Sequence, residues 1–120
     1  MPGFFHDKKL YYTPIEFAIS HIGGTWKMPI LWRLQNGPLR YGELKEDIPR
    51  ISDKMLTSQL KELETKGMVH RKAYAEVPLR VEYTLTEKGK NALPVIETIM
   101  KYGYALIQDE GIEYPPKKEQ

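Results

Sequence analysis

The sequence contains no cysteine among its 120 residues. This absence excludes disulfide bonds, thiol catalysis, thiolate metal sites and redox sensing through a thiol of this chain. No apolar run approaches the roughly 20 residues that a membrane-spanning helix needs, which predicts a soluble protein without a membrane partner. The N-terminus also lacks the basic segment followed by an apolar one that marks a secreted chain. Together these absences are typical of a cytoplasmic protein.

Residues for metal binding and catalysis are scarce as well. The three histidines, His6, His21 and His70, lie far apart and have no cysteine partners, so no metal-ligand spacing is present. Ser20 adjoins His21 but has no supporting constellation, and no glycine-rich phosphate loop occurs. We therefore expect neither an enzyme nor a bound metal or cofactor.

The net charge is small, at +2, but it is unevenly distributed. Residues 1–90 hold 15 basic and 11 acidic residues, a net +4, whereas residues 91–120 hold 3 and 5, a net −2. This asymmetry is compatible with a nucleic-acid-binding face on the body of the chain and a different role for its last helix. Chance variation is the alternative.

Length and hydrophobic periodicity predict one domain over residues 13–109, an irregular arm over 1–12 and a flexible tail over 110–120. Helices are expected over 13–22, 25–36, 41–47 and 52–66, with Thr13, Thr25 and Ser52 as N-caps and Gly67 as a left-handed C-cap. Two antiparallel strands, joined by a loop that contains Pro78, should follow. One long helix, capped by Thr86 and kinked at Pro94, should cover residues 86–109. This order, mostly α with a small β-ribbon, is that of a winged helix-turn-helix.

The helix over residues 52–66 has an unusual polar face. At 100° per residue, its leucines form one stripe, and the opposite side carries Lys54, Thr57, Ser58 and Lys61. All four can donate hydrogen bonds to phosphates, and none specifies a base sequence alone. By itself such a face is more often plain solvated surface. Its place before a strand pair and after a short helix favours a DNA-binding face.

Further cations flank this helix. Arg71, Lys72 and Arg80 lie on the expected ribbon, where a wing contacts the DNA backbone or minor groove. Protection of an edge strand by charge is the alternative for Lys72 and Arg80. The complete set of expected DNA-binding residues is Arg40, Arg50, Ser52, Lys54, Thr57, Ser58, Lys61, Arg71, Lys72 and Arg80.

Several spaced segments, in order, resemble one family. "IGGTWKMPILWRL", "GPLRYGELKEDIPRISDKMLTSQLKELETKGMVHR", "EVPLRVEYTLTEKG" and "ALPVI" are similar to HxlR-type winged helix-turn-helix regulators of bacteria and archaea, over roughly residues 13–105. The resemblance implies a prokaryotic transcription factor with a recognition helix over Ser52–Lys66 and a wing around Glu76–Arg80. Many members carry a cysteine just before the proline of the first helix, and redox-sensing members use it. Here that position is Thr13, which leaves a noncovalent effector or none.

The resemblance also implies a homodimer built from the N-terminal and C-terminal helices. The apolar excess after Thr86 agrees with this, although that helix would alternatively cover only its own core. The expected interface residues are Ile15, Phe17, Leu93, Ile96, Ile99, Met100, Tyr104 and Ile107. Aromatic residues near both ends favour a dimer core, and a pocket for a flat or aromatic effector is the alternative.

We therefore expect a homodimeric, sequence-specific DNA-binding regulator, more specifically a repressor, that binds a pseudo-palindromic operator in double-stranded DNA. The alternative is a winged-helix protein-interaction module that does not bind DNA.

Overall fold

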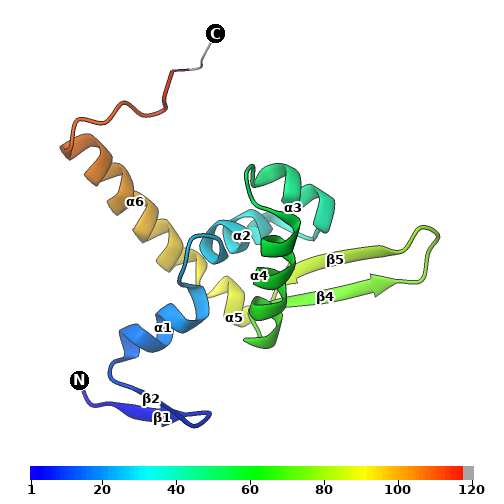
Figure 1. The fold of residues 1–120 in the computed structure, drawn as a ribbon, viewed down its shortest axis with the longest axis horizontal. Coiled ribbons are helices and arrows are strands. Elements are labelled where there is room, and N and C mark those ends of the chain that lie inside the picture. Colours follow the sequence, from blue (N-terminus) through cyan, green and yellow to red (C-terminus); the bar gives the residue numbers. More distant parts are fainter. Residues whose placement is uncertain (118–120) are drawn as a thin grey trace.

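The computed structural model describes residues 1–117, and three projections leave its central body in different directions. These are a long β-ribbon, a long C-terminal helix and a short N-terminal hairpin (Figure 1). The chain is flat as a result, with extents of 52 × 51 × 24 Å. The predicted class, mostly α with a small β-ribbon in a winged helix-turn-helix, is confirmed.

Four helices and a short 3-10 turn build the body. The end of the first helix is fixed as predicted, because Thr13 Oγ1 accepts a hydrogen bond from the Glu16 N–H at 3.1 Å. The second helix begins after Trp26 without a side-chain cap, so the predicted cap at Thr25 is wrong. The elements are α1 (Pro14–Ile22), α2 (Lys27–Arg33), η1 (Leu34–Asn36), α3 (Tyr41–Asp47) and α4 (Asp53–Thr65).

The ribbon consists of β4 (Val69–Tyr74) and β5 (Arg80–Leu85), which pair antiparallel from Val69 opposite Leu85 to Tyr74 opposite Arg80. The two predicted strands are therefore present. A third, short strand, β3 (Leu39–Arg40), pairs with the other edge of β5. Because α3 directly follows β3 in the chain, this pairing connects the base of the ribbon to the start of α3.

The N-terminal arm is not irregular, and that prediction is wrong. β1 (Phe4–His6) and β2 (Lys9–Tyr11) form a hairpin whose two turn residues, Asp7 and Lys8, have φ of 47° and 65°. Two central residues with positive φ match the twist of a two-residue hairpin loop. The rings of Phe4 and Tyr11 lie 5.3 and 4.9 Å from the Phe17 ring, so the hairpin packs on α1.

The predicted single helix over residues 86–109 is two helices, α5 (Glu87–Lys90) and α6 (Leu93–Asp109). Thr86 caps the first as predicted, accepting from the Gly89 N–H at 3.0 Å. Pro94 lies in the first turn of α6, where its missing N–H needs no partner, so it begins a new helix instead of kinking an old one.

The core lies between the body helices, the base of the sheet and the first turns of α6. Ile96 anchors α6 there and is 3% exposed, whereas the C-terminal half of α6 extends beyond the body (Figure 1). After α6 the chain turns, and the Ile112 N–H donates to the Ile107 carbonyl at 3.0 Å. The last three residues of the predicted flexible tail, 118–120, lie outside the described residues. The most deeply buried side chains are Ile30, Leu31, Leu44, Ile51, Leu56, Leu60, Leu63 and Val69.

Candidate nucleic-acid interface

The turn between α3 and α4 sets the angle at which α4 leaves the body. Ile48 and Ile51 are buried at either end of this turn, 3% and 1% exposed. The Lys45 ammonium, from α3, donates to the Ile51 carbonyl, and Arg33 Nε donates to the Asp47 carbonyl at 2.9 Å. Two cations therefore satisfy backbone carbonyls at the α3 end and the turn, and the connection between the helices is fixed from both sides.

Both ends of α4 are determined by local chemistry. Ser52 Oγ accepts from the Met55 N–H at 3.0 Å, and Asp53 places negative charge at the positive end of the helix dipole. At the other end Gly67 has φ of 74°, and the Met68 N–H returns to the Leu63 carbonyl at 2.8 Å. This glycine turn directs the chain straight into β4.

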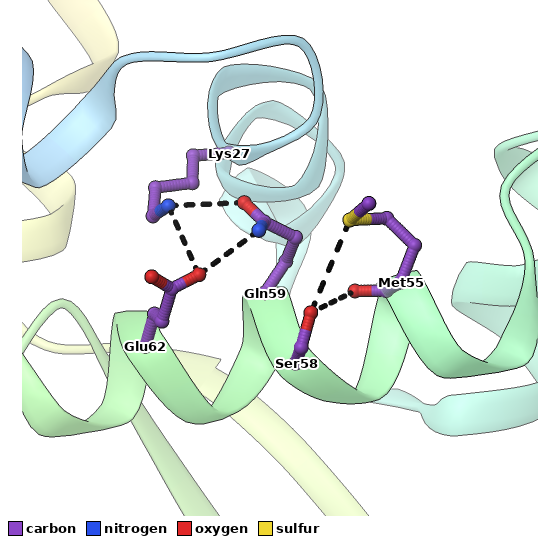
Figure 2. Close-up of polar contacts among 5 residues, drawn as sticks. All are labelled: Lys27, Met55, Ser58, Gln59 and Glu62. Carbon is purple, nitrogen blue, oxygen red and sulfur yellow. Dashed lines mark hydrogen bonds and ion pairs between the residues drawn. The ribbon is translucent and has the colours of Figure 1, made fainter.

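The four polar residues predicted on α4 lie together on its exposed side. Lys54, Thr57, Ser58 and Lys61 are all exposed, whereas Leu56, Leu60 and Leu63 on the opposite side are at most 1% exposed. The Ser58 hydroxyl donates to the Met55 carbonyl of its own helix at 3.1 Å (Figure 2). Its oxygen therefore presents a lone pair outward, which can accept a hydrogen bond from a base amino group.

A partly buried lysine of α2 contacts the same helix. Lys27, in the first turn of α2, has a side chain only 12% exposed and donates to Gln59 Oε1 at 3.0 Å. Its ammonium also lies 3.4 Å from Glu62 Oε2, and Gln59 Nε2 donates to the same carboxylate oxygen at 2.9 Å (Figure 2). This triangle offsets the negative charge of Glu62, one of the acidic residues on α4.

Tyr41 is a contributor that the sequence did not reveal. Its hydroxyl donates to Asp53 Oδ1 at 2.9 Å and also lies 3.1 Å from the Asp53 carbonyl oxygen. The Thr57 hydroxyl donates to Tyr41 Oη at 3.4 Å. Burial raises the pKa of the Tyr41 phenol above its ordinary value, and Asp53 acts in the same direction. Tyr41 thus links the first turn of α3 to the first turns of α4 and orients the Thr57 hydroxyl.

Replacing Tyr41 by phenylalanine should lower the free energy of unfolding by about 1 kcal/mol at neutral pH, because these hydrogen bonds are lost. Since the folded pKa is raised above the unfolded value near 10, this stabilisation is complete below about pH 10 and disappears as pH rises through the folded pKa. Urea unfolding at pH 7 and above pH 10 measures both effects. Tyr102→Phe, at a side chain that is 65% exposed, is the control; equal losses in the two variants would contradict the assignment.

The β4–β5 ribbon places one cation beside the exposed polar face of α4. Arg71, on β4, is exposed and shares a hollow of about 310 Å³ with Thr57, Lys61 and Glu64 of α4 and Tyr83 of β5. Lys72 is exposed as well, and its Nζ lies 4.9 Å from the centre of the Tyr74 ring. Of the predicted residues, Thr57 and Lys61 of α4 and Arg71 of β4 are therefore neighbours across one concave surface, whereas Lys72 lies on the strand face that carries Tyr74.

Arg80 has a different environment. Its side chain is 26% exposed, and its guanidinium lies 3.8 Å over the Tyr74 ring. Nε is 3.2 Å from Glu76 Oε2, without the alignment of a directed hydrogen bond, and Nη1 is 3.5 Å from Glu82 Oε2. The charge of Arg80 is therefore matched by two carboxylates within the wing.

The two remaining predicted arginines lie at the ends of α3. Arg40 precedes α3 and is exposed, and its backbone N–H donates to Glu43 Oε1 at 2.8 Å. Arg50 is exposed in the turn before α4 with φ of 74°, a left-handed conformation that is unfavourable for an arginine. Both side chains are free to reach the backbone of a ligand that lies along α4.

The residues predicted for a dimer interface are divided by the structure. Ile96 belongs to the chain's own core, which corrects its assignment to an interface, and Leu93 and Met100 pack partly against that core. Phe17 is partly buried in the hairpin cluster, and Ile107 is half-buried. The expected residues Ile15, Ile99 and Tyr104 are 63%, 43% and 51% exposed.

A second apolar stripe on α6 was predicted only in part, through Ile99. Val95, Ile99, Tyr102 and Leu106 follow one another at spacings of four, three and four residues, and all are at least 39% exposed. Ile15 and Ile19 on α1 are exposed in the same way. The signal was present in the sequence as a second apolar periodicity within residues 93–107, overlaid on the one that packs into the core.

Within residues 1–117, no three histidine, aspartate or glutamate side chains come together as metal ligands. None of the helices in that part of the chain combines the length and the apolar character needed to cross a bilayer. The polar and cationic surface formed by α4 and β4 is the candidate interface.

Known proteins are similar to this chain over most of its length. The sequence profile of HxlR-like helix-turn-helix domains matches residues 21–111. An uncharacterized HTH-type transcriptional regulator of Methanothermobacter thermautotrophicus is 43% identical over 108 residues, which cover 88% of this chain and 82% of the relative. The uncharacterized HTH-type transcriptional regulator YdzF of Bacillus subtilis is 47% identical over 94 residues, which cover 78% of this chain and 86% of YdzF. The structure of the redox regulator HypR in its oxidized form superposes with a TM-score of 0.74 at 40% identity, covering 78% of this chain and 96% of HypR.

Proposed function

Because this chain belongs to the HxlR-like helix-turn-helix family of DNA-binding transcriptional regulators, we propose that it acts as a homodimer on a pseudo-palindromic operator. The observation that carries the proposal is the exposed face of α4, on which Lys54, Thr57, Ser58 and Lys61 lie together opposite the buried leucines. This face enters the major groove. The regulator works in the cytoplasm of a prokaryotic cell, where the chromosome lies.

Chemistry assigns different tasks to the residues of this face. Lys54 and Lys61 neutralise phosphates or donate to guanine edges, and the hydroxyls of Thr57 and Ser58 bond to base edges. Arg71, beside Lys61 in the same hollow, contacts the adjoining backbone. Ser52 presents the N-terminus of α4 to a phosphate, and Arg40, Arg50 and Lys72 add contacts at the edges.

The two exposed apolar surfaces of α1 and α6 support the homodimer. A soluble chain rarely leaves a stripe such as Val95, Ile99, Tyr102 and Leu106 open to water. A two-fold dimer places its two α4 helices about one turn of DNA apart, roughly 34–36 Å, or a multiple of it. A dimer bound to the operator excludes other proteins from the same DNA. We therefore propose that the protein represses transcription.

A noncovalent effector is the remaining route for a signal. HypR is named a redox regulator, but this chain has no cysteine with which to act as a thiol sensor. A hollow of about 270 Å³ lies between α2 and α6, with an almost wholly apolar lining and one arginine. Its size and lining suit a small flat or aromatic molecule, which would link α6 to the body. The lining residues are Met28, Pro29, Trp32, Arg33, Ile96, Ile99 and Met100.

Lys61→Ala should weaken binding to an operator duplex by about tenfold and reduce the slope of log affinity against log salt by about one unit, because one phosphate contact is lost. Fluorescence anisotropy across a salt series measures both quantities. Lys101→Ala, which removes the same charge from an exposed position on α6, is the control. Identical salt slopes for the two variants would argue against a phosphate contact at Lys61.

The alternative function is a winged-helix interaction module that does not bind DNA. A gel shift at low salt with random genomic fragments distinguishes the two functions, since any DNA-binding member should retain nonspecific affinity there. Absence of a shift would favour the interaction module.

A further inference from the structure

The hydroxyl of Thr57 has no proton left for a ligand. The one phenolic proton of Tyr41 is directed to Asp53, whose Oδ1 lies 2.9 Å and whose carbonyl oxygen lies 3.1 Å from Tyr41 Oη. A carboxylate and a backbone carbonyl can only accept. Tyr41 Oη can therefore only accept from Thr57, whose hydroxyl donates to it at 3.4 Å. The Thr57 oxygen keeps a lone pair for a group outside the protein.

The proton of the Ser58 hydroxyl is used in the same way by a different partner. This hydroxyl donates to the Met55 carbonyl, three residues earlier in α4, at 3.1 Å (Figure 2). A backbone carbonyl cannot return a proton, so Ser58 too is left with a lone pair only. Two consecutive exposed residues of α4 therefore offer acceptors to a ligand, whereas a free serine or threonine hydroxyl could either donate or accept.

The major groove presents groups that such acceptors can distinguish. Adenine N6 and cytosine N4 are amino donors there, whereas the hydrogen-bonding atoms of guanine and thymine are all acceptors. An oxygen that has already used its proton forms a hydrogen bond with an amino base and meets lone pairs at a keto base. Lys54 and Lys61 on the same face cannot make this selection, because an ammonium group only donates.

We propose that Thr57 and Ser58 each select an amino base, adenine or cytosine, on the DNA strand that they face, and that Tyr41 sets this specificity at Thr57. The inference rests on the proposed DNA-binding function and adds to it the class of base that the operator carries opposite these two residues. Tyr41 is a positioning residue, because its own hydroxyl is bound to Asp53 and it acts on the base only through Thr57.

The first experiment identifies the base atom that each hydroxyl contacts. The full chain binds a duplex selected from random DNA by the wild type, and each adenine or cytosine of a half-site is replaced in turn by purine or 2-pyrimidinone, which lack the amino group. At one position this replacement should weaken wild-type binding about fivefold, because one hydrogen bond is lost, an effect that Thr57→Ala should not show. A second position should behave in the same way with Ser58→Ala. Coupling of either alanine variant to a purine N7, which 7-deaza analogues remove, or to no amino group at all, would overturn the inference.

Tyr41→Phe tests the positioning role. Without the phenolic oxygen the Thr57 hydroxyl regains a free proton and can donate to a keto base. The variant should therefore bind duplexes with guanine or thymine at the Thr57 position about as tightly as the selected duplex, which the wild type should prefer about fivefold. Discrimination at the Ser58 position should be unchanged, because the Met55 carbonyl still accepts that proton. A variant that loses affinity equally for all duplexes, or keeps the wild-type ratio, would overturn the role of Tyr41.

Tyr12→Phe is the matched control, since it removes a phenolic oxygen from a side chain that is 67% exposed and lies before α1. It should match the wild type on every duplex, and circular dichroism melting checks that each variant folds. If the wild-type chain binds no DNA even at low salt, the proposed function fails, and the inference fails with it. DNA binding in which none of these ratios changes overturns the inference alone.

Discussion

Gly89→Ala is expected to destabilise the protein by about 3 kcal/mol, the largest loss that we predict for adding one methyl group. A Cβ built on Gly89 would lie 2.1 Å from the Met68 carbonyl oxygen and 3.2 Å from Leu85 Cδ2. That oxygen cannot move freely, because the Thr86 N–H donates to it at 3.1 Å. The Thr86 hydroxyl also fixes this segment, since it donates to the neighbouring Gly67 carbonyl at 2.6 Å and lies 3.2 Å from the Met68 oxygen. Only glycine allows α5 to cross the start of β4 so closely.

Gly42→Ala is the matched control, since a Cβ there meets nothing within 4 Å. Gly42 lies in the short helix α3, where alanine should be neutral or stabilise by up to about 1 kcal/mol. Urea unfolding of the two variants against the wild type measures the difference. Equal stabilities would show that the backbones at residues 68 and 89 separate without loss, and that the close crossing is dispensable.

Gly89 also explains how the wing and α6 are coupled. The crossing of α5 over Met68 joins the end of β5 to the beginning of α6, and Ile96 then fixes α6 in the core. We therefore expect a shift of α6 to move the base of the ribbon as well. This connection gives a ligand beside α6 a physical route to the DNA-binding wing.

Elements with local signals could be predicted from the sequence. Thr13 and Ser52 form their caps with residues three positions away, and Gly67 ends α4 through its own backbone freedom. The polar face of α4 follows from the helical repeat alone, because its leucines fix the buried side. Each of these signals lies within one element, so the sequence alone contains it.

Features that depend on contacts between elements were missed or wrongly placed. A proline in an apolar helical pattern fits both a kink and a helix start, and the sequence does not distinguish them at Pro94. Tyr41 meets Asp53 only after α3 and α4 have packed. The environment of Arg80 depends on strand register, which places Tyr74 opposite it, and on the path of the loop that returns Glu76.

The α6 stripe shows why the interface was only partly predicted. Residues 93–107 carry two apolar periodicities, one through Ile96 and one through Ile99 and Leu106. Periodicity reveals apolar faces but not which of them the chain buries itself. The packing of Ile96 into the core leaves the other face exposed.

Tyr102→Glu combined with Leu106→Glu is expected to convert the dimer to a monomer. Both side chains are exposed, 65% and 39%, so the fold of one chain should persist. They belong to the C-terminal half of α6, and that half extends beyond the body (Figure 1). In a dimer the two carboxylates would be buried against apolar partner surface, which strongly disfavours association. Sedimentation equilibrium at micromolar protein should give the mass of one 14.0 kDa chain.

Lys101→Glu provides a charge-matched control, since it also changes the net charge by two units. It lies on the side of α6 away from the stripe, where its Nζ is 3.4 Å from Glu97 Oε1. The control should remain dimeric. A double variant that keeps the dimer mass would contradict an interface at this stripe.

DNA binding separates loss of the dimer from loss of the reading surface. A monomer that retains α4 and the wing should bind an operator at least about 100-fold more weakly, because two linked half-sites are replaced by one. Its salt slope should fall to about half, since each protomer neutralises the same number of phosphates. Full affinity with the mass of one chain would show that one protomer reads the whole site, and would refute the two-fold arrangement.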